Sequence, residues 1–184
     1  MVSFKKLWRR EKEPEIDPLV DYTLDKMRIG FFVDYDLLTW EVTAMTSFDY
    51  DGQETNEWQI SSGDRVRFLE RASEDGKVEW TLTRRISLRD VDGDVAGTIL
   101  DEGEPPEQVR FEEGEYAAVE SGSGTMVENA GPSGASQARE FVSWSYESEA
   151  GRVLYVVQSG DRDFSAYEGE YVEEYQFTNI LPAG

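Results

Sequence analysis

The sequence contains neither cysteine nor histidine, and these two absences remove several classes of functional site. Without cysteine the chain can form no disulfide, thiolate metal site or thiol nucleophile, and without histidine it can form no imidazole-based catalytic triad. No run of about 18 apolar residues occurs, so we expect no membrane-spanning helix. Because no catalytic motif is present either, we expect a protein that is not an enzyme and that needs no cofactor.

Basic residues are also scarce. The 184 residues include 39 Asp or Glu against 18 Lys or Arg, which gives a formal net charge of −21. This balance argues against a nucleic-acid partner, because phosphate binding requires a basic surface. Dense counterions relieve such self-repulsion, as in halophilic proteins, so one hypothesis is a protein that works in a salty cytoplasm. An ordinary acidic protein is the alternative.

Residues 1–15 differ from the rest of the chain. Within residues 1–12, five basic side chains accompany a single acidic one, and three apolar side chains recur at helical spacing. A short basic amphipathic helix of this kind predicts docking on an anionic membrane surface or on a protein partner. Docking on the acidic body of the protein itself and a disordered tail are open alternatives. The candidate docking residues are Phe4, Lys5, Lys6, Leu7, Trp8, Arg9 and Arg10.

The body of the chain alternates apolar and polar residues with a period of two. Trp40 and Val42 alternate with polar neighbours, and residues 77–83 form the strongest such run. Asp-Gly pairs at 51–52 and 75–76 separate these runs. Alternation bounded by Asp-Gly turns is typical of antiparallel hairpins with one buried face. The sequence therefore predicts an all-β fold.

The two halves of the chain show a similar order of features. Trp40 precedes Trp58 by 18 residues, and Tyr116 precedes Trp144 by 28, which becomes 18 once the small-residue loop 129–138 is removed. One supersecondary unit used twice would give this pattern, although any two β-meanders resemble each other. We predict two similar antiparallel sheets that form a sandwich or a partly open barrel. The expected division is a basic arm at 1–15, a first β repeat at 16–100, a connector at 101–108 and a second β repeat at 109–184, all in one compact domain.

Four tryptophans, Trp40, Trp58, Trp80 and Trp144, lie on the apolar phase of their predicted strands. Residues of this kind usually fill a core. If the sheets leave a cavity, however, these rings would line a pocket for a small hydrophobic ligand. The glutamates beside them are expected to occupy outward positions. The segment 121–124, Ser-Gly-Ser-Gly, is expected to be a loop.

Asp90, Asp92 and Asp94 are a weak candidate for a metal site. Alternate aspartates beside a glycine suggest a calcium loop, but Val95 stands where the EF-hand pattern requires glycine, and the closing glutamate is replaced. A turn in which these side chains cap the backbone explains the segment equally well.

Several short aromatic motifs carry a resemblance to a known family. They are FVDYDL at 32–37, TWEV at 39–42, EWQI at 57–60, FLE at 68–70, GEY at 114–116, WSY at 144–146 and VEEYQF at 172–177. Through these motifs the chain resembles a bacterial family known as domain of unknown function 4178, over roughly residues 18–182. The resemblance implies a small soluble β protein without established activity, often encoded beside membrane-stress or polyamine-synthesis genes.

Three hypotheses for the function follow. The first is a non-catalytic accessory or interaction protein of the cytoplasm, recruited by its arm to an unknown protein partner or to the inner membrane surface. The second is a β-barrel carrier that binds a small ligand in a tryptophan-lined pocket. The third is an enzyme that uses carboxylates alone.

Overall fold

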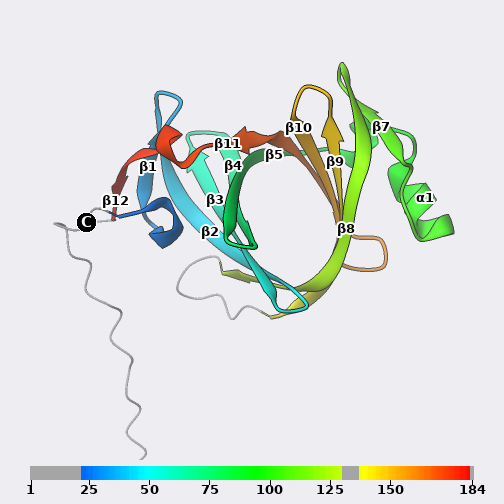
Figure 1. Cartoon of the computed structure of the whole chain (residues 1–184), viewed down its shortest axis with the longest axis horizontal. Helices are drawn as coiled ribbons and strands as arrows, with labels where there is room; N and C mark the ends of the chain where they lie inside the picture. Colours follow the sequence, from blue (N-terminus) through cyan, green and yellow to red (C-terminus); the bar gives the residue numbers. More distant parts are fainter. Residues whose placement is uncertain (1–21, 130–136, 183–184) are drawn as a thin grey trace, which may run out of the picture.

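A computed structural model describes residues 22–129 and 137–182 of the chain. Strands dominate these residues, which confirms the all-β prediction (Figure 1). The first half contains η1 (Leu24–Lys26), β1 (Phe32–Tyr35), β2 (Leu38–Tyr50), β3 (Gln53–Ser62), β4 (Arg65–Glu74), β5 (Lys77–Ile86), η2 (Leu88–Asp90) and β6 (Val91–Asp92). The second half contains α1 (Val95–Glu102), β7 (Gln108–Phe111), β8 (Gly114–Asn129), β9 (Arg139–Ser148), β10 (Arg152–Gln158), β11 (Phe164–Val172), η3 (Glu174–Gln176) and β12 (Thr178–Leu181).

Eight of the strands close into a ring. Their order is β2-β3-β4-β5-β11-β10-β9-β8, and β8 pairs back with β2. Every neighbouring pair in this ring is antiparallel. Figure 1 shows these strands surrounding a central space, with β1 and β12 outside the ring on one side and α1 and β7 on the opposite side. An eight-stranded barrel is wide enough either to be filled by side chains or to hold one small ligand.

The predicted Asp-Gly turns connect the hairpins of the first half. Asp51 and Gly52 have φ angles of +53° and +100°, and Asp75 and Gly76 have φ angles of +49° and +79°. Two successive positive φ angles are the mark of the tight turn that matches the twist of a two-stranded hairpin, and Asp-Gly is a preferred pair for it. These local signals therefore fix the β2–β3 and β4–β5 connections.

The pairing of β2 with β8 closes the ring, and we call this pairing the seam. It depends on glycine. Strand β2 pairs with β8 from Met45, opposite Asn129, to Asp49, opposite Thr125. A Cβ atom on Gly124 would lie 1.9 Å from the carbonyl oxygen of Asp49. The expectation that residues 121–124 form a loop is wrong, because they lie inside β8, where glycine allows close approach of a neighbouring strand.

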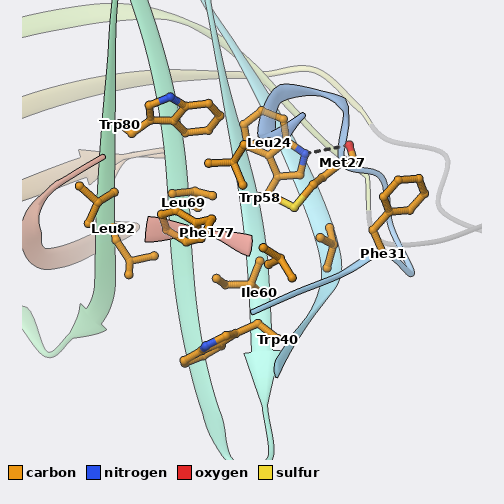
Figure 2. Close-up of a cluster of buried hydrophobic side chains, with 13 residues drawn as sticks. Leu24, Met27, Phe31, Trp40, Trp58, Ile60, Leu69, Trp80, Leu82 and Phe177 are labelled. Atoms are coloured by element: carbon orange, nitrogen blue, oxygen red, sulfur yellow. Dashed lines mark hydrogen bonds between the residues drawn. The ribbon is translucent and has the colours of Figure 1, made fainter. Parts of the chain in front are cut away.

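A first apolar cluster lies on the outer face of the barrel (Figure 2). It joins side chains of β2, β3, β4 and β5 to residues of the segment around η1, to β1 and to Phe177. The tryptophan indoles bind the covering segments directly: Trp58 Nε1 donates to the Met27 carbonyl at 3.0 Å, and Trp40 Nε1 donates to the Tyr35 carbonyl at 3.1 Å. The cluster thus fastens the N-terminal segment to the barrel wall.

A second apolar cluster lies on the wall formed by β8, β9 and β10, under β6, α1 and β7. Trp144 Nε1 donates to Glu104 Oε2 at 3.0 Å, and the Tyr146 hydroxyl donates to the Pro106 carbonyl at 3.0 Å. Helix α1 was not predicted. Only Val95 and Ile99 of this eight-residue helix are buried, so its apolar stripe is too short to give a clear periodic signal.

The order of the strands has a twofold pattern. Strands β1–β5 are followed by η2 and β6, and strands β7–β11 are followed by η3 and β12. Strand β6 then pairs with β7, and β12 pairs with β1. The internal duplication itself stays a prediction; α1 crosses the expected boundary at residue 100, and β7 begins within the expected connector.

Candidate functional site

The ring of strands surrounds a cavity of about 990 Å³. This volume lies at the upper end of the range for small-molecule sites, which are about 300–1,000 Å³. All eight strands of the ring contribute to its wall. Because neighbouring residues of a strand point to opposite faces, the apolar phase of these strands faces outward to the two clusters and the largely polar phase faces the cavity.

One row of side chains crosses five strands of the wall. Thr46, Glu57, Glu70, Thr81 and Tyr171 are successive register partners on β2, β3, β4, β5 and β11, and all five line the cavity. Residues directly opposite each other on antiparallel strands have Cβ atoms about 5 Å apart. These residues therefore form a continuous band, which we call the polar row.

The two carboxyl groups of the polar row have strongly raised pKa values. Removal from bulk solvent, followed by repulsion from Glu70 and Glu128, raises the pKa of Glu57 to about 8, against a small opposing effect of the Thr46 hydroxyl. Burial raises the pKa of Glu70 to about 7. Both side chains border the cavity and so retain some accessible surface, but the barrel wall surrounds them and keeps bulk solvent away.

No cationic side chain in residues 22–129 and 137–182 forms an ion pair with Glu57 or Glu70. Among the described residues, three cationic side chains line the cavity, and each contacts another group. These contacts are Lys77 with Glu79 at 2.6 Å, Arg139 with Glu128 at 3.5 Å and Arg85 with Ser165 at 3.0 Å. The polar row therefore carries acidic groups that the described protein does not neutralise.

Thr81, beside Glu70 in the polar row, also lacks a partner. Its Oγ1 atom is the buried side-chain oxygen without a hydrogen bond in the described part of the chain, and the residue is only 5% exposed. The Thr81 hydroxyl lies near enough to Tyr155 to oppose the rise that burial causes in the pKa of Tyr155, but no hydrogen bond of ordinary geometry joins the two side chains. An unmade hydrogen bond of this kind costs stability, so a group on a bound molecule would relieve that cost.

Apolar side chains gather next to the polar row. Phe48 follows Thr46 by two positions on β2, which places it about 7 Å further along the barrel. Phe48, Met126 and Phe141 form a buried cluster with Tyr50, whose ring meets that of Phe141 edge-on at 5.0 Å between centroids. Phe48, Tyr50 and Met126 line the cavity. The cavity thus has an acidic band and an adjoining apolar surface.

A second polar cluster is buried outside the cavity. The side chain of Glu168 on β11 is 4% exposed, and it accepts hydrogen bonds from Arg152 Nε at 2.9 Å, Arg84 Nε at 3.3 Å and the Tyr116 hydroxyl at 3.2 Å. These residues come from β10, β5 and β8. Every carboxylate oxygen of Glu168 has a donor, so this cluster joins four strands of the wall and is fully satisfied.

The structure places the four predicted tryptophans away from the cavity. Trp40, Trp58 and Trp80 belong to the first outer cluster and Trp144 to the second, and none of them lines the cavity. They pack as core between the barrel wall and the covering segments. Of the two alternatives for these tryptophans, core filling is therefore the one that the structure has, and a tryptophan-lined pocket is not. The cavity is lined mainly by the side chains that alternate with these apolar residues along the strands, and most of them are polar.

The other predicted site residues are not brought together. Asp90, Asp92 and Asp94 are exposed and lie in η2, in β6 and before α1. Among the residues that the structure describes, no group of three or more acidic side chains is arranged to hold a metal ion. The candidate docking residues of the arm and most of the predicted loop 129–138 lie outside the described residues. In the described ranges, no helix is long and apolar enough to cross a membrane.

The carboxylates of the polar row were missed because alternation alone does not say which face of a strand points into a ring. Glu57 beside Trp58, and Glu70 beside Leu69, fit an outward polar position equally well. The pairing of β2 with β8, which makes the polar face an interior one, joins residues about 80 positions apart. No local pattern in the sequence predicts this pairing.

The double variant Glu57→Gln, Glu70→Gln is expected to be more stable than the wild type at alkaline pH, by about 2 kcal/mol above about pH 8. Both pKa values exceed the ordinary 4.5, so the folded state binds more protons than the unfolded state between about pH 4.5 and 8. The contribution of these groups to stability therefore falls as the pH rises through that window. Urea denaturation across a pH series measures the difference.

The gain in stability of the double variant should vanish near about pH 5, where the carboxyl groups are protonated in the folded state. Glu41→Gln is the matched control, since Glu41 is an exposed carboxylate of β2 outside the cavity. A difference between wild type and double variant that is the same at about pH 5 and about pH 9 would contradict the assigned pKa values.

Comparison with known proteins gives a family but no activity. Residues 28–174 match the model of the family described as "Domain of unknown function (DUF4178)". An uncharacterized protein of Aquifex aeolicus (strain VF5) is 26% identical over 178 residues, which cover 97% of this chain and 96% of the relative. No solved structure matches the chain.

Proposed function

We propose, since the chain belongs to the family described as domain of unknown function (DUF4178), that its function is the one its cavity supports: binding of a small molecule inside the barrel. The observation that carries this proposal is the cavity of about 990 Å³ inside the ring, on whose wall lie Glu57 and Glu70, without a cationic partner among the described residues, and Thr81, without a hydrogen bond. A few converging polar groups in an otherwise well-formed cavity are the usual composition of a ligand site.

The energetic cost of these groups supports the proposal. Two carboxylates directly opposite each other repel, and a buried hydroxyl without a hydrogen bond is unfavourable. Apolar residues at the same positions would give a more stable barrel. Sequences that retain such costs commonly do so at functional sites, where a bound molecule recovers the lost interactions.

We propose binding without chemical conversion. Glu57 and Glu70 lie on neighbouring strands of one wall, so both approach a molecule in the cavity from the same side. Hydrolysis of a glycosidic bond needs two carboxyl groups that flank the bond, one as the acid and one as base or nucleophile. The geometry of the polar row suits recognition of a charged group better than that division of roles.

An accessory role through the basic arm stays a prediction. Phe4, Leu7 and Trp8 and the basic residues among them lie outside the described residues, so docking on a partner protein or on the inner membrane surface has only its sequence pattern in support. Such docking and ligand binding in the barrel are compatible, because they use separate parts of the chain.

The proposal is tested by blocking the cavity. Ala72 lies on β4 two positions beyond Glu70 and lines the cavity, whereas Ala117 on β8 is exposed and does not. A thermal-shift screen of neutral, anionic and cationic small molecules should find at least one class that stabilises the wild type and Ala117→Trp. Ala72→Trp should weaken that binding about tenfold or more, measured by calorimetry.

Two results would contradict the proposed function. One is a screen in which no molecule of any charge class stabilises the protein. The other is binding that Ala72→Trp leaves unchanged, which would place the ligand on the outer surface. Circular dichroism of both tryptophan variants checks that the barrel is still folded.

A further inference from the structure

We infer that the ligand of the cavity is a small organic cation, whose ammonium group lies at the polar row between Glu57 and Glu70 and whose apolar body lies against Phe48 and Tyr50. This inference rests on the proposed function and adds the chemical class of the ligand.

The cavity wall is acidic at the polar row. Glu57 and Glu70 face each other across the β3–β4 pair, and the cations that line the cavity are already bound to other groups. A cation placed between two carboxylates relieves their repulsion and forms charge-assisted hydrogen bonds with both. An anion would meet two like charges in a site shielded from solvent, where such repulsion is strongest.

The Thr81 hydroxyl adds hydrogen-bonding capacity beside the two carboxyl groups. Thr81 is the register partner of Glu70 on β5, so the two side chains are neighbours on the cavity wall. The Thr81 hydroxyl oxygen is buried and has no hydrogen bond, and the residue itself is part of the cavity wall. A primary ammonium has three N–H donors, which matches two carboxylates and one hydroxyl oxygen.

The cavity has room for more than an ammonium group. The volume far exceeds that of an ammonium group alone, and Phe48 and Tyr50 follow Thr46 on β2 by two and four positions, about 7 and 13 Å along the strand. An apolar body attached to the ammonium reaches this surface without leaving the cavity. Aromatic rings there add favourable contacts with both the body and the positive charge.

A bare metal ion fits the same wall less well. Calcium takes six to eight oxygen ligands and magnesium demands a near-octahedral set. Within residues 22–129 and 137–182, no group of three or more acidic side chains is placed to supply them. The experiment nevertheless includes both ions, because they share their charge with the proposed ligand.

The experiment uses three probes of equal size and different charge: benzylamine, benzyl alcohol and benzoate. Calorimetry of the full chain is done at about pH 8.5, where the carboxyl groups of the polar row ionise, and in salt that screens the acidic outer surface. Benzylamine should bind at least about tenfold more tightly than benzyl alcohol, and benzoate should not bind. Calcium and magnesium should not displace benzylamine.

Charge-neutral variants locate the ammonium. Glu57→Gln and Glu70→Gln should each weaken benzylamine about tenfold, whereas Glu41→Gln, outside the cavity, should change it less than about twofold. Because both cavity substitutions remove a repulsion, these variants should fold. Thr81→Val should weaken benzylamine about threefold and leave benzyltrimethylammonium unchanged, since that cation has no N–H donor for the hydroxyl.

The outcomes separate this inference from the proposed function. If benzyl alcohol or benzoate binds best and Ala72→Trp blocks it, the barrel is a ligand site but the ligand is not a cation. If calcium or magnesium displaces benzylamine, or if Glu41→Gln weakens it as much as Glu57→Gln, the inference is overturned as well. If no probe binds in the cavity, both proposals fail.

Discussion

Gly124→Ala is expected to lower the free energy of unfolding by about 3 kcal/mol, at the upper end of the usual cost of overpacking. The added Cβ atom would lie 1.9 Å from the carbonyl oxygen of Asp49, which is a backbone atom of the neighbouring strand. Relief requires β8 to move away from β2, and that movement breaks the seam on which the ring depends. Urea denaturation measures the loss.

Gly122→Ala is the matched control for this substitution. It lies two positions earlier on the same strand, but the nearest atoms to its added Cβ belong to the ring of Tyr50, at 2.9 Å. A side chain can shift where a backbone cannot, so we expect a loss of about 1 kcal/mol. Hydrogen exchange should show faster amides at the β2–β8 seam in Gly124→Ala. Equal stability of the two variants would contradict the seam as described.

Glu168→Ala is expected to have the next largest effect, a loss of about 2–3 kcal/mol. Removing this carboxylate takes away the partner of two guanidinium groups and of the buried Tyr116 hydroxyl. The loss falls below the usual cost of breaking a buried ion pair, because Arg84 and Arg152 are each 39% exposed and regain solvent contacts.

Glu170→Ala provides the comparison for Glu168→Ala. Glu170 also pairs with Arg152, at 3.2 Å, but its side chain is 50% exposed. An exposed pair of this kind contributes at most about 1 kcal/mol. Urea denaturation of both variants should therefore give losses that differ by about 2 kcal/mol. Similar losses would show that Glu168 is not the centre of a buried network.

The two acidic sites in the barrel wall illustrate two uses of a carboxylate. Glu168 is surrounded by donors and stabilises the wall, whereas Glu57 and Glu70 have no cationic partner in the described protein and weaken it at neutral pH. Natural proteins usually satisfy buried charges. The contrast within one barrel is what marks the polar row as a place for an external group.

The strands of the fold could be predicted from the sequence because their signals are local. The alternation around Trp40 and Trp80 and the Asp-Gly turns at 51–52 and 75–76 act over a few residues, and the structure has strands and turns at those places. Helix α1 could not be predicted, because its two buried residues are too few to give a periodic pattern.

The site could not be predicted, because it depends on contacts between distant parts of the chain. Thr46, Glu57, Glu70 and Thr81 are polar residues of amphipathic strands, and such residues normally face solvent. Closure of the ring through β2 and β8 turns that face into an interior. The sequence signal for closure is Gly124, and small residues in the Ser-Gly-Ser-Gly segment suggest a loop as readily as a close strand contact.

A crystal structure of the protein grown with benzylamine tests the central claim most directly. We expect the probe inside the barrel, with its nitrogen about 3 Å from a carboxylate oxygen of Glu57 or Glu70 and its ring beside Phe48. Two results would contradict the account. One is benzylamine bound only to the acidic outer surface, and the other is a barrel in which β2 and β8 do not pair.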